Sequence, residues 1–154
     1  MPVLALNKKA KFDYEILETF EAGIVLSGQE VKSVRQKQVS LKGAYVTIDQ
    51  NKQAYLINAS ISPYKMAGPL PDYDPTRSRK LLLKKKELDY LAGKIQTTGL
   101  TLVGLSLYTK HRKIKLEIGL AKGKKKVDKR HDIKEKEQKR DIKRILKQKV
   151  KNQF

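Results

Sequence analysis

Lys113-Ile-Lys-Leu-Glu-Ile-Gly-Leu120 is the stretch of the 154-residue chain that bears most directly on its fold. Charged and apolar side chains alternate along most of its length. Successive side chains of a β-strand point to opposite faces of a sheet, so the alternation predicts a strand with one buried and one exposed face. The predicted buried face consists of Ile114, Leu116, Ile118 and Leu120.

Strand signals on either side of polar turns predict two hairpins. Leu100 to Tyr108 is separated from the quoted strand by a turn around Lys110-His111-Arg112. Further upstream, Ala44 to Ile48 and Ala54 to Ile61 flank a polar run that suits a hairpin loop of about five residues. Phe12 to Leu26 is rich in β-forming side chains and predicts one long strand or two short ones.

Helices are predicted at two places. Gly28 to Lys37 follows a turn, and Lys84 to Gln96 places aliphatic side chains at helical spacing before Gly99. Between them, the proline-rich segment from Pro63 to Arg79 predicts an irregular, exposed loop. About six strands with two or three helices predict a mainly β fold, a small antiparallel barrel like the oligonucleotide-binding (OB) fold.

Positive charge is unevenly distributed along the chain. The net charge is +19, from 35 Lys and Arg against 16 Asp and Glu. Residues 1–120 carry a net +9 and residues 121–154 a net +10. Such an excess of cations indicates a polyanionic partner, and nucleic acid is the first candidate. We expect an RNA-binding barrel over residues 1–123 and a basic tail over residues 124–154.

The tail has few large apolar side chains, so we expect it to be disordered when free and helical when bound. Its aliphatic residues form one narrow apolar stripe on an otherwise charged helix. An isolated helix of this kind is marginal in water, so a partner is needed to order it. The stripe consists of Ile142, Ile145, Leu146 and Val150.

Secretion and membrane insertion are not expected. The chain has no Cys, which fits a reducing compartment such as the cytoplasm. Val3-Leu4-Ala5-Leu6 is shorter than the apolar core of roughly 7 to 15 residues in a signal peptide. Leu100 to Tyr108, the most apolar stretch, falls far short of the ~20 residues of a membrane-spanning helix.

Catalytic chemistry is not expected either. His111 and His131 are the only side chains that ordinarily titrate near neutral pH, and solvated surface histidine is the simpler interpretation of both. Residues 119–125 resemble a phosphate-binding loop, but the spacing is one residue short and the hydroxyl after Lys is absent. The sequence therefore predicts no enzyme, no cofactor, no metal site and no small-molecule substrate.

Basic clusters carry the remaining chemistry. One such cluster is usually a solvated face, whereas six in a short chain favour RNA binding. The six are Lys8-Lys9-Lys11, Arg77-Arg79-Lys80, Lys84-Lys85-Lys86, Lys113-Lys115, Lys122-Lys124-Lys125-Lys126 and Lys129-Arg130.

Several runs resemble, in order, the SmpB family of bacterial tmRNA-binding proteins, over essentially the whole chain. They include Leu6-Asn7-Lys8-Lys9-Ala10, Phe20-Glu21-Ala22-Gly23-Ile24, Glu30-Val31-Lys32-Ser33, Asp74-Pro75-Thr76-Arg77-Ser78-Arg79-Lys80, Leu120-Ala121-Lys122-Gly123-Lys124-Lys125 and Asp128-Lys129-Arg130. The resemblance implies an OB-type barrel that binds the tRNA-like domain of tmRNA. It also implies an adaptor that brings alanyl-tmRNA, with elongation factor Tu, to stalled ribosomes. The tail is then expected to enter the vacant mRNA channel beside the decoding centre of the small subunit.

The resemblance also implies which residues act. The positions that match the family's RNA-contacting motif are Asn7, Lys8, Lys9, Glu21, Leu82, Lys115, Lys122, Gly123, Lys124 and Lys125. Those that match its tail function are Asp128, Lys129, Arg130 and Ile145, to which the apolar stripe adds Ile142 and Leu146. The family often has an aromatic residue or His where this chain has Val127, so a stacking contact in the decoding centre is not expected here.

Two alternatives from other classes stay open. A structural ribosomal protein, or a general RNA-binding protein, would have the same basic composition. A peripheral membrane protein would use the amphipathic tail on anionic lipid, although its stripe is narrow and lacks Trp.

Overall fold

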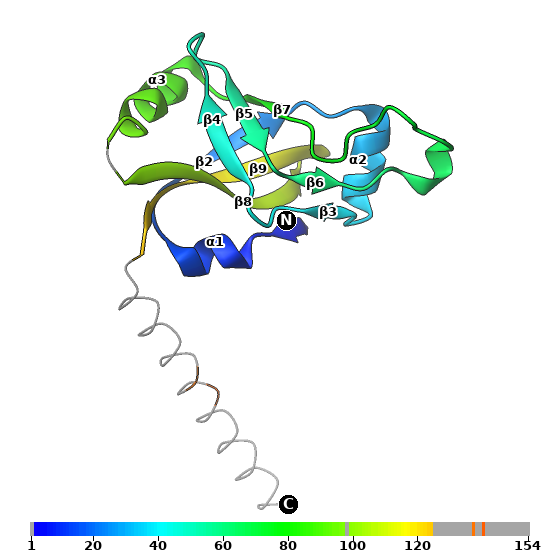
Figure 1. The fold of residues 1–154 in the computed structure, drawn as a ribbon, viewed down its shortest axis with the longest axis horizontal. Helices are drawn as coiled ribbons and strands as arrows, with labels where there is room; N and C mark the ends of the chain where they lie inside the picture. The colour runs from blue at the N-terminus through cyan, green and yellow to red at the C-terminus, as the bar shows by residue number, and fades with distance from the viewer. Residues whose placement is uncertain (1, 98, 125–136, 138–139, 141–154) are drawn as a thin grey trace, which may run out of the picture. The chain divides into compact units, whose positions relative to one another are not determined.

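Six antiparallel strands close into a ring in the computed structural model, which describes residues 2–97, 99–124, 137 and 140 (Figure 1). Residues Met1–Gly123 form one compact unit. The ring runs β8 (Leu100–Lys110), β4 (Tyr45–Ile48), β5 (Ala54–Ile57), β7 (Arg79–Leu82), β2 (Tyr14–Ile24) and β9 (Lys113–Gly123), which pairs with β8 again. The predicted mainly β, OB-like barrel is confirmed.

Three shorter strands lie outside this ring. The N-terminal β1 (Val3–Leu6) pairs with β8 beside β4, and β3 (Val39–Ser40) and β6 (Ser60–Ile61) form a separate two-stranded sheet. The short apolar run at the N-terminus is therefore a strand, which its sequence did not identify. The predicted strand Ala54 to Ile61 is wrong as one element, because Asn58 has φ 65° and divides it into β5 and β6.

The two predicted hairpins are confirmed. Strands β4 and β5 pair from Tyr45–Ile57 to Ile48–Ala54, around the polar loop. Strands β8 and β9 pair along their whole length to Lys110–Lys113, so the turn between them is only His111 and Arg112.

Both predicted helices are confirmed, as α2 (Gly28–Arg35) and α3 (Lys85–Lys94). A third helix, α1 (Lys8–Asp13), takes the place of the strand predicted to begin at Phe12, so that strand prediction is wrong for its first two residues. A single 3-10 turn, η1 (Lys65–Ala67), lies in the proline-rich segment. No helix in the described part of the chain is long and apolar enough to cross a membrane.

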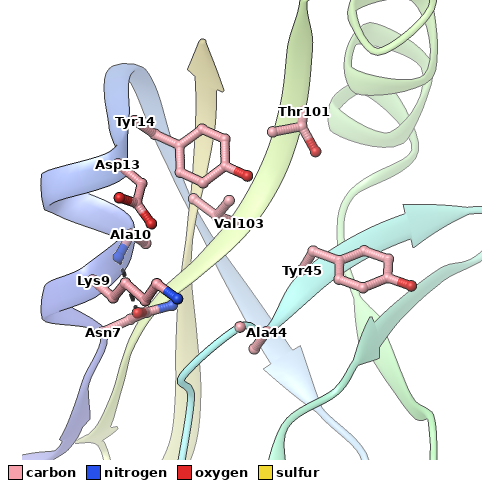
Figure 2. Close-up of a pocket in the computed structure, with 10 residues that line it drawn as sticks. Asn7, Lys9, Ala10, Asp13, Tyr14, Ala44, Tyr45, Thr101 and Val103 are labelled. Carbon is pink, nitrogen blue, oxygen red and sulfur yellow. Dashed lines mark hydrogen bonds between the residues drawn. The ribbon is translucent and has the colours of Figure 1, made fainter. Parts of the chain in front are cut away.

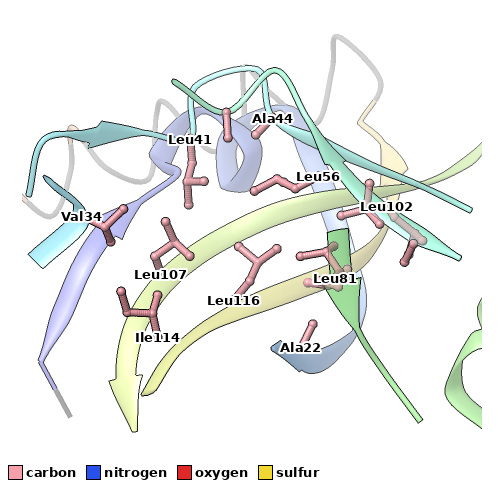
Figure 3. Close-up of a cluster of buried hydrophobic side chains, with 14 of the residues drawn as sticks. Ala22, Val34, Leu41, Ala44, Leu56, Leu81, Leu102, Leu107, Ile114 and Leu116 are labelled. Carbon is pink, nitrogen blue, oxygen red and sulfur yellow. The ribbon is translucent and has the colours of Figure 1, made fainter. Parts of the chain in front are cut away.

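The barrel interior is filled by aliphatic side chains from every strand of the ring (Figure 3). Leu56 on β5, Leu102 on β8 and Leu116 on β9 are fully buried, and Figure 3 shows them between the strands. All four apolar residues of the β9 alternation are buried, as predicted. Each such side chain contributes roughly 1.5–3 kcal/mol when removed from water, so this alternation supports the whole ring.

The proline-rich segment is anchored rather than simply exposed. Arg79, at the start of β7, is fully buried and donates hydrogen bonds of 3.0 and 2.7 Å to Oε2 of Glu30 on α2. Arg77 also pairs with Glu30, and the Tyr73 hydroxyl lies 3.1 Å from Glu30 Oε2. The prediction of an exposed loop is therefore wrong at Arg79, which belongs to a buried ion pair and is removed from the RNA-binding clusters.

Glu30 keeps its charge in this network. Burial alone would raise the pKa of Glu30, but the hydrogen bonds from Arg77, from the Ser27 backbone and from Arg79 lower it to about 2. Ser27 and Glu30 also form a capping box at the start of α2, with the Ser27 N–H donating to Glu30 Oε1 at 3.0 Å. The carboxylate thus links α2 to the base of the loop.

Candidate nucleic-acid interface

Asn7 fixes the start of α1 and the lysines that follow it. Its carboxamide nitrogen donates to the carbonyl oxygens of Leu41 at 2.9 Å and Gly104 at 2.8 Å, and its oxygen accepts from the Ala10 N–H at 3.1 Å. The residue is only 3% exposed. Both N–H groups of its side chain are therefore used inside the protein, so Asn7 positions the start of α1, and its predicted contact with RNA stays a prediction.

Lys8 and Lys9 extend into solvent from the first turn of α1. Together with Lys42 they line a groove of about 280 Å³. Lys9 also borders a cavity of about 250 Å³ between α1, β4 and β8, which Tyr14 and Tyr45 line as well. Figure 2 shows the Tyr14 ring between α1 and β8 and the Tyr45 ring turned away from α1. This end of the barrel thus places cations beside aromatic rings, the combination that favours contacts with unpaired bases.

A second group of predicted residues lies in one row across the outside of the barrel. Gly23 on β2 pairs with Leu82 on one side and with Lys115 on the other, and Lys115 pairs in turn with Tyr108 on β8. Directly opposite residues of paired strands point to the same face, so these positions share the outer surface. Leu82 is 56% exposed, which shows that it does not fill the barrel.

Glu21 lies in the same region and is held by two neighbours. The Tyr108 hydroxyl donates to Glu21 Oε2 at 2.6 Å, and Lys110 Nζ lies 3.2 Å from the same oxygen. The hydrogen bond from Tyr108 lowers the pKa of Glu21, desolvation opposes it, and Lys110 and Lys115 lower it further. Burial and the bond to Glu21 raise the pKa of Tyr108. Glu21 therefore orients a phenol and an ammonium group on this surface.

The remaining predicted contacts lie at the far end of β9. Lys122 pairs with Glu15 of β2, Gly123 pairs with Tyr14, and Lys124 follows directly. Because Tyr14 is also the residue that ends α1, this group lies close to the Lys8 and Lys9 end of the molecule.

The predicted RNA-binding residues therefore fall into two groups at opposite ends of β9. Lys115 and Lys122 are seven residues apart on one strand, at most roughly 23 Å at 3.3 Å per residue. The distal group contains Glu21, Leu82 and Lys115, and the proximal group contains Lys8, Lys9, Lys122 and Gly123. One small contact cannot involve both, whereas a folded RNA can span that distance.

Some predicted residues lie outside the described part of the chain. They are Lys125, Asp128, Lys129, Arg130, Ile142, Ile145 and Leu146. Their roles stay predictions, as does the assignment of residues 124–154 to a tail.

The structure adds cations that the sequence analysis did not assign to RNA. Arg35 at the end of α2 donates to the backbone carbonyl of Arg112 at 3.0 Å, and both lie beside Lys113 and Lys115. The two arginines are 77 positions apart, so no local pattern joins them. They extend the distal group.

Comparison with known proteins identifies the family to which this chain belongs. The sequence model of the family described as "SmpB protein" matches residues 4–148. The chain belongs to the SmpB family. It is 49% identical over 146 residues to an SsrA-binding protein of Thermosynechococcus vestitus, with 95% of each chain covered. It is 52% identical over 149 residues to an SsrA-binding protein of Sulfurihydrogenibium sp., with 97% of each covered.

A solved relative of the SmpB family shares the fold as well. A chain from the structure described as "tmRNA-SmpB: a journey to the center of the bacterial ribosome" is 48% identical and superposes with a TM-score of 0.67. The match covers 82% of this chain and 87% of that one. The six-stranded ring is therefore an SmpB-family barrel.

Proposed function

We propose that this protein is a tmRNA-binding adaptor of trans-translation, without catalytic activity of its own. It binds the tRNA-like domain of tmRNA through its barrel and brings alanyl-tmRNA, with elongation factor Tu, to stalled ribosomes. Its tail then occupies the vacant mRNA channel beside the decoding centre. The observation that carries this proposal is membership of the SmpB family across residues 4–148, among relatives named SsrA-binding proteins.

The geometry of the barrel supports the RNA-binding part of the proposal. Exposed lysines project from elements that are fixed by buried hydrogen bonds, as Asn7 shows for Lys8 and Lys9. Because the backbone that carries these lysines is already fixed, only their side chains lose entropy when they meet phosphates. Two groups up to about 23 Å apart suit a folded RNA, which presents phosphates and unpaired bases over such a span.

The test compares the full chain with a chain that ends after Val127. Both should bind tmRNA with similar affinity, because most of the proposed contacts precede residue 124. Only the full chain should support peptide tagging on stalled ribosomes. Loss of tmRNA binding by a truncated chain that is still folded would refute this division of roles, and absence of tmRNA from the RNA that co-purifies with the protein would refute the function itself.

A salt wash of ribosomes distinguishes the proposed adaptor from a structural ribosomal protein. An adaptor held mainly by phosphate contacts should leave ribosomes at high salt, because each contact releases counterions. A protein that threads ribosomal RNA permanently should remain in the pellet.

A further inference from the structure

The proline-rich segment between β6 and β7 carries an uncharged tip and projects beyond α2 and β6 (Figure 1). The tip is Met-Ala-Gly-Pro-Leu-Pro, residues 66–71, in a chain of which 33% of the residues are charged. Met66 is 81% exposed, the highest exposed fraction among the large apolar side chains of the described residues. Ala67, Gly68 and Pro69 are exposed as well. The tip therefore presents a continuous apolar surface to solvent.

Hydrogen bonds fix the chain on both sides of this tip. Before it, the Tyr64 N–H donates to the Gln29 carboxamide oxygen on α2 at 2.9 Å. After it, the Tyr73 hydroxyl donates to the Ile61 carbonyl oxygen at 2.9 Å, and the Ile61 N–H donates to the Pro75 carbonyl oxygen at 3.0 Å. The two ends of the tip are thus attached to α2 and to β6.

The backbone of the tip is restricted as well. The Ala67 N–H donates to the Tyr64 carbonyl oxygen at 3.0 Å and closes the turn η1. Gly68 follows with φ 79°, a conformation that glycine adopts without strain. Pro69 and Pro71 then fix their own φ angles through their rings. A segment that is ordered before binding loses less conformational entropy when it binds.

The chemistry of the tip selects the kind of partner. Residues 66–71 offer no cation for a phosphate and no planar ring for a base, the two contacts on which RNA recognition depends. Methionine is enriched in the buried centres of protein interfaces, where its flexible side chain fits irregular apolar surfaces. An apolar groove on a protein is therefore the surface that this tip fits.

We propose that the tip of the proline-rich segment docks through Met66 in an apolar groove of a ribosomal protein, while the barrel holds tmRNA. This inference rests on the proposed function, because it supplies a protein contact for an adaptor that acts on the ribosome. It concerns a separate part of the surface, since none of the predicted RNA-binding residues lies between β6 and β7.

The test measures binding of the complex of tmRNA with the full chain to purified stalled ribosomes, without elongation factor Tu. Met66→Lys should weaken this binding about tenfold, because an apolar contact is lost and a charge is desolvated in its place. If the tip lay against ribosomal RNA instead, the same change should strengthen binding, since an added cation releases counterions. Met66→Leu keeps the apolar volume and should bind as the wild type does.

Leu17→Lys is the matched control. It adds the same charge at an aliphatic side chain that is 48% exposed, on β2 instead of the proline-rich segment, and should not weaken ribosome binding. Because Met66 and Leu17 are exposed, all three variants should equal the wild type in thermal unfolding and in affinity for free tmRNA.

Cross-linking identifies the surface that the tip meets. A photoreactive aliphatic residue placed at position 66 should cross-link to one ribosomal protein when the tmRNA complex is bound to purified stalled ribosomes. Cross-links that go mainly to ribosomal RNA, or to a second copy of this chain, would overturn the inference.

The outcomes separate this inference from the proposed function. If the wild-type complex does not bind stalled ribosomes, or the wild-type chain does not bind tmRNA, the proposed function fails and the inference with it. If the wild-type complex binds but Met66→Lys binds as tightly or more tightly, or Leu17→Lys weakens binding equally, the proposed function stands and the tip does not dock in a protein groove.

Discussion

Arg79 and Lys80 are adjacent in the chain but have opposite surroundings. Arg79 is fully buried against Glu30, and Lys80 is exposed. Neighbouring residues of β7 point to opposite faces, so one position decides whether a cation stabilises the fold or is available to RNA. The planar guanidinium of Arg79 satisfies five hydrogen-bond acceptors in a confined space, which a lysine ammonium cannot do.

Removal of the Glu30 charge should destabilise the protein by on the order of 3 kcal/mol, because Arg79 would then be buried without a counter-charge. We expect Glu30→Gln to show this loss in denaturant unfolding at pH 7. Glu15→Gln changes an exposed carboxylate and should have little effect. If both variants unfold at the same denaturant concentration, the ion pair contributes nothing net.

The Glu30 carboxylate should also make the free energy of unfolding depend on pH. The pKa of Glu30 is about 2 in the folded protein and 4.5 as a reference value, so its contribution is complete above pH 4.5 and is lost as the pH falls toward 2. The difference in unfolding free energy between wild type and Glu30→Gln should therefore shrink over that interval. A constant difference from pH 6 to pH 2 would contradict the assignment.

Positioning and contact should be separable at the start of α1. Asn7→Ala removes a helix cap and leaves two buried carbonyl oxygens without their donor, so it should destabilise by ~1–3 kcal/mol. Lys9→Ala should leave thermal stability unchanged and reduce the slope of log affinity against log salt by ~1 if Lys9 meets a phosphate. An unchanged slope would show that Lys9 does not contact a phosphate. An Asn7→Ala variant as stable as the wild type would contradict the positioning role.

At the scale of elements, the sequence was informative where one face of an element is buried. The alternation along β9 and the spacing in α3 both report a single buried face, and both elements were predicted. The helix α1 has six residues and buries only Ala10, so it has no apolar period to detect. Asn7 caps its beginning through the Ala10 N–H, but the tertiary hydrogen bonds that hold Asn7 to Leu41 and Gly104 are not encoded in local sequence.

The turn between β8 and β9 shows the same limit. His111 has φ 51° and Arg112 φ 65°, the left-handed conformation required by a two-residue hairpin turn. Asn and Gly are the usual residues there, so the turn was predicted from the strands on either side of it and not from the turn residues themselves. An L-residue in this conformation strains the backbone, so His111 and Arg112 reduce the stability of the turn.

Arg112→Gly should therefore raise stability while it weakens RNA binding. Glycine adopts positive φ without strain, and we expect a gain of ~0.5–1 kcal/mol in unfolding free energy. The hydrogen bond from Arg35 to the backbone carbonyl can remain. Affinity for tmRNA should fall, since a cation of the distal group is lost. Lower stability would refute the strain argument, and unchanged affinity would remove Arg112 from the interface.

At the scale of the whole molecule, closure of the ring could not be read from local pattern. It depends on β2 pairing with β9 across about a hundred residues of chain, whereas the pairing of β8 with β9 is a local hairpin. For the same reason the sequence analysis grouped basic residues that are neighbours in the chain. In the barrel, the basic residues that lie together are those at the same end of the strands. Leu82 and Lys115 meet only through Gly23.

The charge and the apolar stripe of residues 124–154 predict different effects of the same substitution. Residues 124–154 lie almost wholly outside the described structure, so the argument rests on their sequence. If charge alone determined their function, Ile145→Lys would be neutral or beneficial, because the segment already carries Lys143, Arg144 and Lys147 and a channel lined by RNA favours cations.

If the bound tail is a helix whose stripe packs on a specific surface, Ile145→Lys should instead impair function. Burial of an Ile side chain contributes ~1.5–3 kcal/mol, and a charge at that position adds a desolvation cost. Ile145→Pro should impair function too, because Pro inside a helix costs ~3 kcal/mol. Both variants should bind free tmRNA normally, since the barrel makes those contacts. Peptide tagging on stalled ribosomes is the measurement, and normal tagging by both variants would leave the tail a purely electrostatic segment.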